Sequence, residues 1–537
     1  MGAAPAGSTD WDERDGDLAP VVYVRPGERS GDGSRAAPVG SLAAALAREP
    51  RAATVLVGRG TLALTDAIRL RGGVTLRGAG AGVSVIESSA AGAAVRVEGE
   101  VTLEGLTVRA APGVVAVDVP SEGAVFTARD LTVERGATGL RAGVGATICA
   151  ERVTVAGTSS RGLSVEGGAA FVRGAWVRGG DSFGVVSDRG HLTLLDSLVE
   201  GHARDGVAVR GSRLGEACAR DEDCAAPTGV CPGFVVERVC ARGPRVDDPG
   251  RCLEVAELRD VASLRNGVTA ARFERATPTA EEISASMSDE VLARPGPVAR
   301  VTRAVLAGTT VPLGAVGGDG LYVGPGATLS VDPQVMSDEA RGAATEVVGN
   351  ARAGVLVDGD RTAGPVPSGL RAAGRLEARG LRVASNGGPG LFVQSRAALT
   401  ALSFSDVIDN SALGLGVTSG ASVALIQCTR FVATREGVIV PEDTTTAPFR
   451  VGDGLSLADG VAPTEVVEGE FSDNARFGVV LSNAELELRG VARGVGNGFR
   501  GVGRVGAAPV VGAESIEGRA EPPATFRVVR GPVGGGG

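Results

Sequence analysis

Gly162-Leu163-Ser164-Val165 is one copy of a short phrase that decides the fold of this 537-residue chain. A typical copy has a glycine or alanine, an apolar residue, any residue, and then a valine or leucine. Successive copies begin 22 or 23 residues apart, at Ala94, Ala116, Gly139, Gly162, Gly184 and Gly206. A constant period of this size indicates a solenoid that adds one coil for each phrase.

Each repeat also contains a second segment rich in β-branched residues, such as 101–108 and 125–133. These segments alternate apolar with polar residues, as half-buried strands do. So short a coil has no room for an amphipathic helix between its strands, which excludes a βαβ unit. We therefore predict an all-β chain that forms a parallel β-helix of about 14 to 16 coils, with strands ~4.8 Å apart between coils.

Composition limits the classes of function. The chain is 43% hydrophobic and has 83 glycines, which suits short strands joined by tight turns, but only 3% of its residues are aromatic. Its net charge of −9 argues against nucleic acid as a partner. It has no run of eighteen apolar residues that could span a membrane. The first residues lack the basic and apolar regions of an export signal.

The repeat pattern divides the chain into segments. A strand, a polar loop, a short helix starting at Ser41 and a second strand precede the coils, and we expect this unit to cover the open end of the solenoid. The predicted segments are an acidic arm at 1–19, the cap and first coil at 20–73, regular coils at 74–210, a cysteine-rich insert with a short helix (280–293) at 211–297, coils with loop inserts at 298–510, and a tail at 511–537.

Five of the seven cysteines crowd into the insert, separated by 5, 6, 8 and 11 residues: Cys218, Cys224, Cys231, Cys240 and Cys252. Zinc sites usually contain close pairs such as CxxC, which are absent here, so the spacing favours disulfides and no metal. Disulfides imply an oxidising compartment. The fifth cysteine stays free or pairs with a distant partner. Cys149 and Cys428 fall in repeat strands, where we expect buried thiols.

Asparagine precedes the later copies of the phrase by four residues, at Asn350, Asn386, Asn410, Asn474 and Asn497. His202 has the same offset before Gly206. Asparagine tolerates the left-handed backbone and can hydrogen-bond the same turn of the next coil. We therefore predict that this column is a structural ladder at a turn and not a row of ligands.

The period, the Asn-x-x-x-Gly phrase and the leading segment (Val22-Tyr23-Val24, Pro38, Ser41-Leu42 and Val55-Leu56-Val57) resemble the right-handed parallel β-helix superfamily of pectin-lyase-like proteins. The resemblance covers about residues 20 to 510 and implies a fold, not an activity. The superfamily contains polysaccharide lyases, hydrolases and epimerases as well as non-catalytic secreted proteins. Of its polygalacturonase motifs, only Gly201-His202-Ala203 is half matched here, and no catalytic residue is identified.

Extra residues interrupt the repeats at about 211–297, 358–374 and 441–460. With Gly437-Val438 counted as a copy of the phrase, each insert is expected to follow the same strand of its coil. Loops at one point of successive coils would project from one flank, which in solenoids is often the binding face. Paired carboxylates on that flank could bind a sugar or calcium, with no other cofactor expected. The candidate ligand-binding residues are Asp319, Asp358, Asp360, Arg361, Glu442, Asp443, Arg450 and Asp453.

We expect a secreted, periplasmic or cell-surface protein of bacterial type, without catalytic activity, that binds a glycan or a protein partner through loops on this flank. The alternative is a lyase, hydrolase or epimerase acting on an acidic polysaccharide. The sequence names neither the ligand, the disulfide connectivity nor the oligomeric state.

Overall fold

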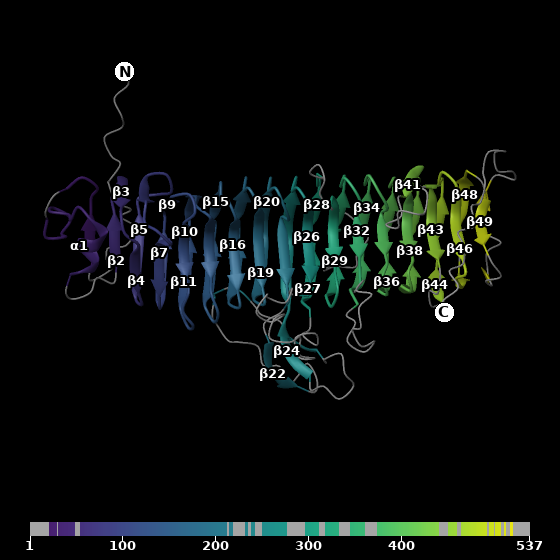
Figure 1. Cartoon of the computed structure of the whole chain (residues 1–537), viewed down its shortest axis with the longest axis horizontal. Helices are drawn as coiled ribbons and strands as arrows, with labels where there is room; N and C mark the ends of the chain where they lie inside the picture. Colours follow the sequence, from purple (N-terminus) through teal and green to yellow (C-terminus); the bar gives the residue numbers. More distant parts are fainter. Residues whose placement is uncertain are drawn as a thin grey trace, which may run out of the picture. The chain divides into compact units, whose positions relative to one another are not determined.

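The computed structural model describes residues 21–28, 31–48, 54–211, 214–218, 231–232, 234, 238–241, 250–275, 296–310, 317–331, 344–359, 373–439, 449–458, 463–490, 493–498, 500–505, 510–511 and 516–518. The chain forms two compact units. Unit 1 consists of Met1–Gly267 and Ala276–Ala299, and unit 2 of Val268–Arg275 and Arg300–Gly537. Within each unit the strands of successive coils stack side by side (Figure 1).

Unit 1 contains three columns of parallel strands, because each coil contributes one short strand to each column. The first column contains β2 (Thr54–Val57), β5 (Val74–Gly78), β8 (Glu100–Glu104), β11 (Val125–Arg129), β14 (Thr147–Glu151), β17 (Ala169–Arg173), β20 (His191–Glu200) and β25 (Ala256–Leu264). The second contains β3 (Gly60–Leu64), β6 (Ser84–Ser88), β9 (Thr107–Ala110), β12 (Thr132–Arg135), β15 (Thr154–Ala156) and β18 (Trp176–Arg178). The third contains β4 (Ile68–Arg71), β7 (Ala93–Glu98), β10 (Val115–Val119), β13 (Thr138–Ala142), β16 (Arg161–Glu166), β19 (Phe183–Asp188) and β21 (Val207–Arg210).

Unit 2 repeats this plan. Its first column contains β30 (Thr328–Val331), β33 (Arg375–Arg379), β36 (Ala398–Ser403), β39 (Ser422–Gln427), β44 (Thr464–Val467), β47 (Leu486–Arg489) and β50 (Val510–Val511). Its second contains β28 (Val305–Ala307), β31 (Glu346–Val348), β34 (Arg382–Ala384), β37 (Asp406–Ile408), β40 (Arg430–Val432) and β45 (Glu470–Ser472). Its third contains β26 (Thr269–Glu274), β29 (Asp319–Val323), β32 (Val355–Val357), β35 (Leu391–Val393), β38 (Leu413–Val417), β43 (Asp453–Ala458), β46 (Phe477–Ser482) and β49 (Arg500–Val505). The remaining described strands outside the hairpins below are β27 (Val298–Thr302), β48 (Gly494–Asn497) and β51 (Ile516–Gly518).

The core of each unit is built from stacked apolar residues. On the first column, Val101, Phe126 and Ile148 lie directly opposite one another in consecutive strands, and all three are buried. Each such side chain stabilises the fold by about 1.5–3 kcal/mol. The third column has seven strands in unit 1 and eight in unit 2 among the described residues. The chain is therefore a parallel β-helix, and its coil number agrees with the prediction.

The corners of the coils depend on single residues in the left-handed region. Between the first and second columns the residue is Asp130 (φ 49°) in one coil and Arg152 (φ 52°) in the next. In β20 and β25 the strand continues through this corner, with Asp196 at φ 48° and Asp260 at φ 55°. One such residue turns the chain without a loop, which keeps the repeat short.

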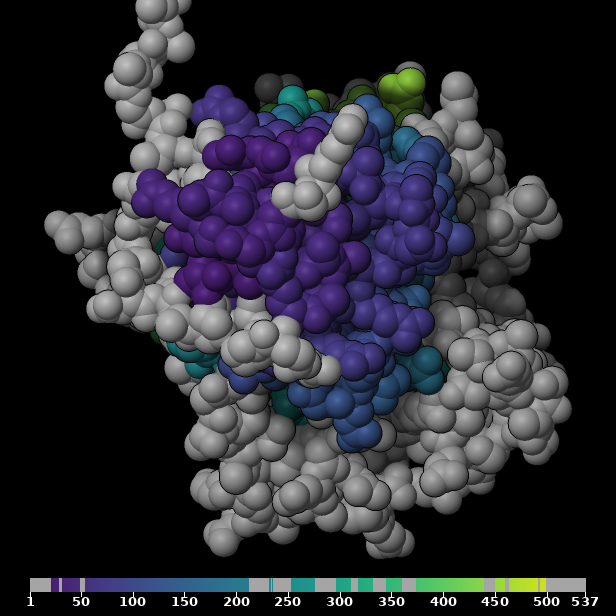
Figure 2. All heavy atoms as spheres, turned by 90° about the vertical axis from the view of Figure 1, so that its left-hand side faces the viewer, coloured from purple at the N-terminus to yellow at the C-terminus, as the bar shows by residue number. Residues whose placement is uncertain are grey.

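The N-terminal cap has the predicted order of elements. β1 (Val21–Val24) pairs with β2, and α1 (Leu42–Leu46) starts at Ser41, whose Oγ accepts a hydrogen bond from the Ala44 N–H at 3.2 Å. Leu42 is fully buried. Figure 2 looks onto this end of unit 1, where the cap residues lie over the first coils. The predicted helix at 280–293 lies outside the described residues.

The insert folds against the outer face of unit 1. Cys231 forms a disulfide with Cys149, 82 residues away in the sequence, with 5.6 Å between their Cα atoms. Cys149 was expected to be a buried thiol in the core, but the buried neighbours Ile148 and Ala150 point inward, so Cys149 faces outward. It is covered because Phe234 and Cys231 of the insert pack against it.

The insert also contains a small antiparallel sheet of its own, with the order β22 (Leu214–Cys218), β24 (Gly250–Glu254), β23 (Arg238–Ala241). Cys428 was the second thiol expected in a core strand. It lies at a corner after β39 with φ 48°, half-buried, and its thiol donates to Glu468 Oε2 at 3.3 Å.

Candidate functional site

Two of the predicted ligand residues are buried in ion pairs between coils. Asp319 and Asp453 are the first residues of β29 and β43, and each is 1% exposed. Arg352 of the following coil donates Nε to Asp319 Oδ1 at 2.8 Å and also bonds Oδ2. Arg476 binds the two oxygens of Asp453 at 3.0 and 3.1 Å. These carboxylates hold neighbouring coils together and do not face a ligand.

Burial dominates the electrostatics of Asp453. It raises the pKa of this carboxyl to about 6, although Arg476 and the Phe477 N–H favour the charged form. Asp319 occupies the same position in its own coil, the first residue of a third-column strand, and its carboxylate also accepts a hydrogen bond from the Ala353 N–H at 3.2 Å. The recurring pattern is a strand-start aspartate with a bidentate arginine from the next coil, which is a structural device of the repeat.

The other predicted ligands do not form a cluster in the described part of the chain. Asp358 follows β32 and is 5% exposed. Arg450 lies in the hairpin of β41 (Gly437–Ile439) and β42 (Phe449–Val451), where it forms an ion pair with Glu436 at 3.2 Å. The residues that lie outside the described residues are Asp360, Arg361, Glu442 and Asp443.

The inserts do not all follow the same strand. The insert at 358–374 lies between the third and first columns, because it joins β32 to β33. Gly437-Val438 matches the phrase but belongs to β41, which pairs with β42 in a hairpin. The third-column strand of that coil is β43, which pairs with β38. The insert at 441–460 was therefore placed on the wrong side of its strand, and its hairpin leaves from a different corner. The prediction of a single flank therefore holds for the inserts that join β21 to β25 and β32 to β33, and it is wrong for the hairpin that precedes β43.

The predicted asparagine column lies at the corner between the second and third columns of unit 2. The amides of Asn350, Asn386 and Asn474 each connect three coils. Asn386 Oδ1 accepts the N–H and the Nδ2 of Asn350, both at 3.0 Å, while its own Nδ2 donates to Val347 O at 3.1 Å and to Asn410 Oδ1 at 2.8 Å. All five asparagines are buried. The left-handed residue is the one before the asparagine, for example Asp409 before Asn410 (φ 54°).

His202 occupies the equivalent corner in unit 1. Its Nδ1 accepts the Gly180 N–H at 3.2 Å, and its Nε2 lies 3.2 Å from Val177 O. The backbone N–H of His202 donates to Asn266 Oδ1 at 3.1 Å. Burial lowers the pKa of His202, so this imidazole is held neutral by its surroundings.

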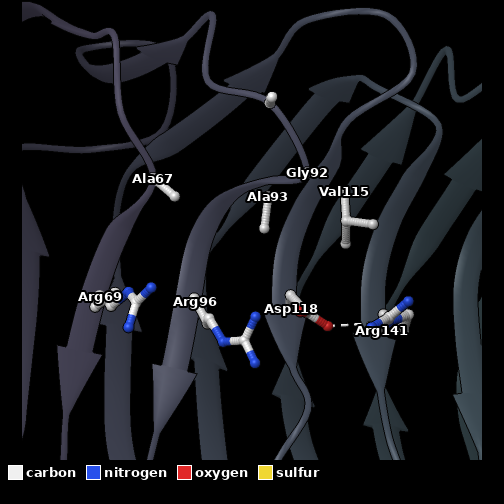
Figure 3. Close-up of a pocket in the computed structure, with 9 residues that line it drawn as sticks. Ala67, Arg69, Gly92, Ala93, Arg96, Val115, Asp118 and Arg141 are labelled. Carbon is white, nitrogen blue, oxygen red and sulfur yellow. Dashed lines mark hydrogen bonds and ion pairs between the residues drawn. The ribbon is translucent and has the colours of Figure 1, made fainter.

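A row of charged side chains on the third column of unit 1 is the best-defined candidate site. Arg69, Arg96, Asp118 and Arg141 lie directly opposite one another in β4, β7, β10 and β13. Figure 3 shows their side chains following one another across the four strands. Together with two neighbours they form the surface that we call the arginine face, which consists of Arg69, Arg71, Arg96, Glu98, Asp118 and Arg141.

The arginine face has an excess of positive charge. Asp118 is paired, since it accepts a hydrogen bond from Arg141 Nε at 2.9 Å. Glu98 lies 3.8 to 3.9 Å from Arg69, Arg71 and Arg96, which is too far for a hydrogen bond. Four guanidinium groups thus face two carboxylates. In the described part of the chain the Arg69 and Arg96 guanidiniums donate no hydrogen bond, and their side chains are 66% and 44% exposed.

Four residues of the arginine face, Arg69, Arg96, Asp118 and Arg141, line a hollow of about 360 Å³. Small apolar residues, including Ala67, Ala93 and Val115, line it beside the charged row (Figure 3). A second hollow of about 410 Å³ lies on the second column. There Arg109 is already held by Glu134 at 2.9 Å and Glu87 at 3.5 Å. Among the described residues, the second hollow therefore presents one arginine without a hydrogen bond, Arg135, whereas the first presents two, Arg69 and Arg96.

The arginine face was missed although its signal is in the repeat phrase. The third residue of each phrase points outward, so reading that position down the repeat gives Arg96, Asp118 and Arg141 in consecutive coils. No group of three or more His, Cys, Asp or Glu residues that could hold a metal occurs in the described residues. None of the described helices is long and apolar enough to cross a membrane.

No protein-family model matches the chain, and no curated protein matches it at a significant level. Solved structures with a similar course of the chain include the A-module of the Azotobacter vinelandii mannuronan C-5 epimerase AlgE4, at 14% identity over 92% of this chain and 100% of that one, with a TM-score of 0.35. Others are a GH87 alpha-1,3-glucanase catalytic domain, at 10% identity over 93% and 69% with a TM-score of 0.34, and the pectate lyase Pel9A, at 12% identity over 68% and 75% with a TM-score of 0.28. At such identities the likeness concerns the fold alone. The chain's own strand pairing shows a parallel β-helix fold.

Proposed function

We propose that this protein binds a polysaccharide that carries carboxylate groups, and that the arginine face of unit 1 is its binding surface. The observation that supports this proposal is a row across four consecutive strands that holds Arg69, Arg96 and Arg141 with Asp118 between the last two, in a chain whose net charge is −9. A guanidinium with available donors is suited to bidentate bonds with a carboxylate.

The repeat geometry suits a linear ligand. Consecutive strands of a sheet lie ~4.8 Å apart, so the row offers cationic groups at regular intervals across the strands. An extended polyanion lying across β4, β7 and β10 would meet Arg69 and Arg96 in turn and then reach Arg141 beyond Asp118. The apolar residues of the hollow would contact the non-polar faces of sugar rings. Binding loops on the flank, as predicted from the sequence, are not needed for this arrangement.

The proposal is tested by titrating the full chain with polygalacturonate, alginate and neutral dextran in a calorimeter. We expect binding to the two polyuronates that weakens with salt, and none to dextran. Because two charge-assisted contacts would be lost, the variant Arg69→Gln/Arg96→Gln should bind at least about tenfold more weakly.

Arg109→Gln is the matched control, since Arg109 lies on the other hollow and is already paired. Equal binding of dextran, or a double variant that binds polyuronates as well as the unmodified protein, would overturn the proposal.

A second candidate function is supported by Asp118. This carboxylate is 4% exposed and lies within the charged row, where a bound uronate would place a ring carbon near a group able to transfer protons. In that case the protein would be a lyase, hydrolase or epimerase. Incubation with each polyuronate, followed by ultraviolet absorbance, reducing-end and NMR analysis, distinguishes the two functions. Turnover that Asp118→Asn abolishes without loss of binding would favour the enzyme.

We also propose that the chain is exported and acts outside the cytoplasm of a bacterial cell. The disulfide between Cys149 and Cys231 supports this, because disulfides persist in oxidising compartments. Fractionation of expressing cells, with the thiol state of Cys149 measured in each fraction, tests this location.

A further inference from the structure

Four cysteines of the insert remain once the disulfide of Cys149 with Cys231 and the free thiol of Cys428 are set aside. They are Cys218, Cys224, Cys240 and Cys252. Four cysteines allow three pairings, and the intervals in the sequence do not choose between them. The register of the small antiparallel sheet in the insert distinguishes between these three pairings.

β23 and β24 are antiparallel, and their register places Cys240 directly opposite Cys252. Directly opposite residues of such a pair have Cα atoms about 4.5 or 5.5 Å apart, and a disulfide needs about 4.4 to 6.8 Å. Either kind of opposite site therefore allows the bond without moving the backbone.

The register disfavours the competing partners of Cys218. Cys218 lies in β22 opposite Gly250, two positions along β24 from Cys252. Such diagonal positions are about 7–8 Å apart, beyond the reach of a disulfide. β22 and β23 lie on opposite sides of β24, so Cys218 and Cys240 are separated by two strand spacings, ~9.6 Å.

We propose that Cys240 and Cys252 form a cross-strand disulfide in the insert, which leaves Cys218 to pair with Cys224 by count. Each bond forms when two thiols lose two protons and two electrons to a disulfide of a thiol–disulfide oxidant, which becomes a dithiol. A three-stranded sheet alone has little core, so internal bridges would supply the stability that it lacks. The insert would then contain two internal disulfides and be joined to β14 by the disulfide between Cys231 and Cys149.

The test is a peptide map of the full chain, purified from an oxidising compartment, alkylated without reduction and cut with trypsin. Arginines at 238, 242, 251 and 259 separate Cys240 (peptide 239–242) from Cys252 (peptide 252–259). We expect these two peptides joined to each other alone. Peptides 142–152, 214–220 and 221–238 should form a second linked species, because Cys224 and Cys231 share one peptide. Cys428 should be alkylated.

Peptide 252–259 joined to 214–220, or 239–242 recovered in alkylated form, would overturn the proposal. So would a zinc ion retained by the native protein with the four thiols reduced. Cys240→Ser provides an independent check, since it should leave Cys252 open to alkylation while Cys149 stays bonded. Cys428→Ser is the matched control and should leave the map of the insert unchanged.

Discussion

Units 1 and 2 close the corner between their second and third columns with the same backbone hydrogen bond but with different side chains. In unit 1 the Ala203 N–H donates to Gly180 O at 3.1 Å, and in unit 2 the Ser411 N–H donates to Asn386 O at 3.1 Å. The corner residues of unit 1 are Gly136, Thr158, Gly180, His202 and Asn266, and those of unit 2 are Thr309, Asn350, Asn386, Asn410, Thr434, Asn474 and Asn497. The backbone alone is thus enough to form a coil, and amides accumulate at this corner in unit 2.

The largest expected effect concerns the buried ion pairs. Arg476→Ala leaves the carboxylate of Asp453 buried without its partner, which should cost about 3–5 kcal/mol in the free energy of unfolding. The comparable variant in unit 1 is Arg141→Ala. Asp118 is also buried, but Arg96 lies directly opposite it in β7 and remains as a second cation, so the loss of Arg141 should cost less, about 1–2 kcal/mol. Urea denaturation followed by circular dichroism measures both. Equal effects would mean that the pairs of the two units are equivalent.

Removing one amide from the column of unit 2 should have the next largest effect. In Asn410→Ala the N–H and Nδ2 of Asn386 lose their acceptor, which lay 3.2 and 2.8 Å away. We expect a loss of about 1–3 kcal/mol, since buried donors would be left unsatisfied. Thr434→Ala is the matched control, because in the described part of the chain this hydroxyl has no hydrogen-bond partner. Hydrogen exchange of the neighbouring coils should detect the first variant and not the second.

The histidine at the corner of unit 1 should make that unit sensitive to acid. The folded state lowers the pKa of His202, so below its ordinary pKa of about 6.5 the unfolded state binds the proton more readily. Stability is therefore complete above this pH and falls as the pH drops, by at most about 1.4 kcal/mol for each pH unit. His202→Asn should remove this part of the pH dependence in thermal unfolding between pH 7 and 5. A variant that keeps the same slope would assign the acid sensitivity to other groups.

The smallest expected effect is a gain in stability. Thr434 interrupts the column between Asn410 and Asn474, and its backbone N–H already donates to Asn474 Oδ1 at 3.1 Å. Thr434→Asn would offer an acceptor to Asn410 and should raise the free energy of unfolding by about 0.5–1.5 kcal/mol. Thr158→Asn in unit 1, where the preceding corner residue is Gly136, should gain less. A loss of stability in Thr434→Asn would show that the corner cannot hold the longer side chain.

The repeat phrase predicted the fold because its period fixes one coil and its alternation fixes which residues face the core. The same reasoning failed at 437–440, where the sequence Gly-Val-Ile-Val matches the phrase as well as 454–457 does. Only the pairing of β38 with β43 distinguishes the two segments, and a local sequence pattern does not reveal which distant segments pair. The burial of Cys149 likewise depends on the insert that folds back over it.

The candidate site was less predictable. Asp319 and Asp453 were predicted to bind a ligand, and the local sequence does not show what they pair with. Their arginine partners lie 33 and 23 residues further along the chain, in the next coil. By contrast, the arginine face follows directly from reading one position of the phrase down consecutive coils. The arginine face did not stand out in the sequence, because arginine is frequent throughout this chain, which has no lysine.

The amide column of unit 2 has a direction. Asn350 and Asn386 each donate their backbone N–H and their Nδ2 to the amide oxygen of the asparagine that comes next in the sequence. During synthesis, the most recently completed coil therefore keeps two hydrated donors until its successor arrives. A coil already in place offers its acceptor only to the coil before it. Each coil of the column therefore has two unlike faces, with donors toward the later coil and an acceptor toward the earlier one, so that coils can stack through these amides in one order only.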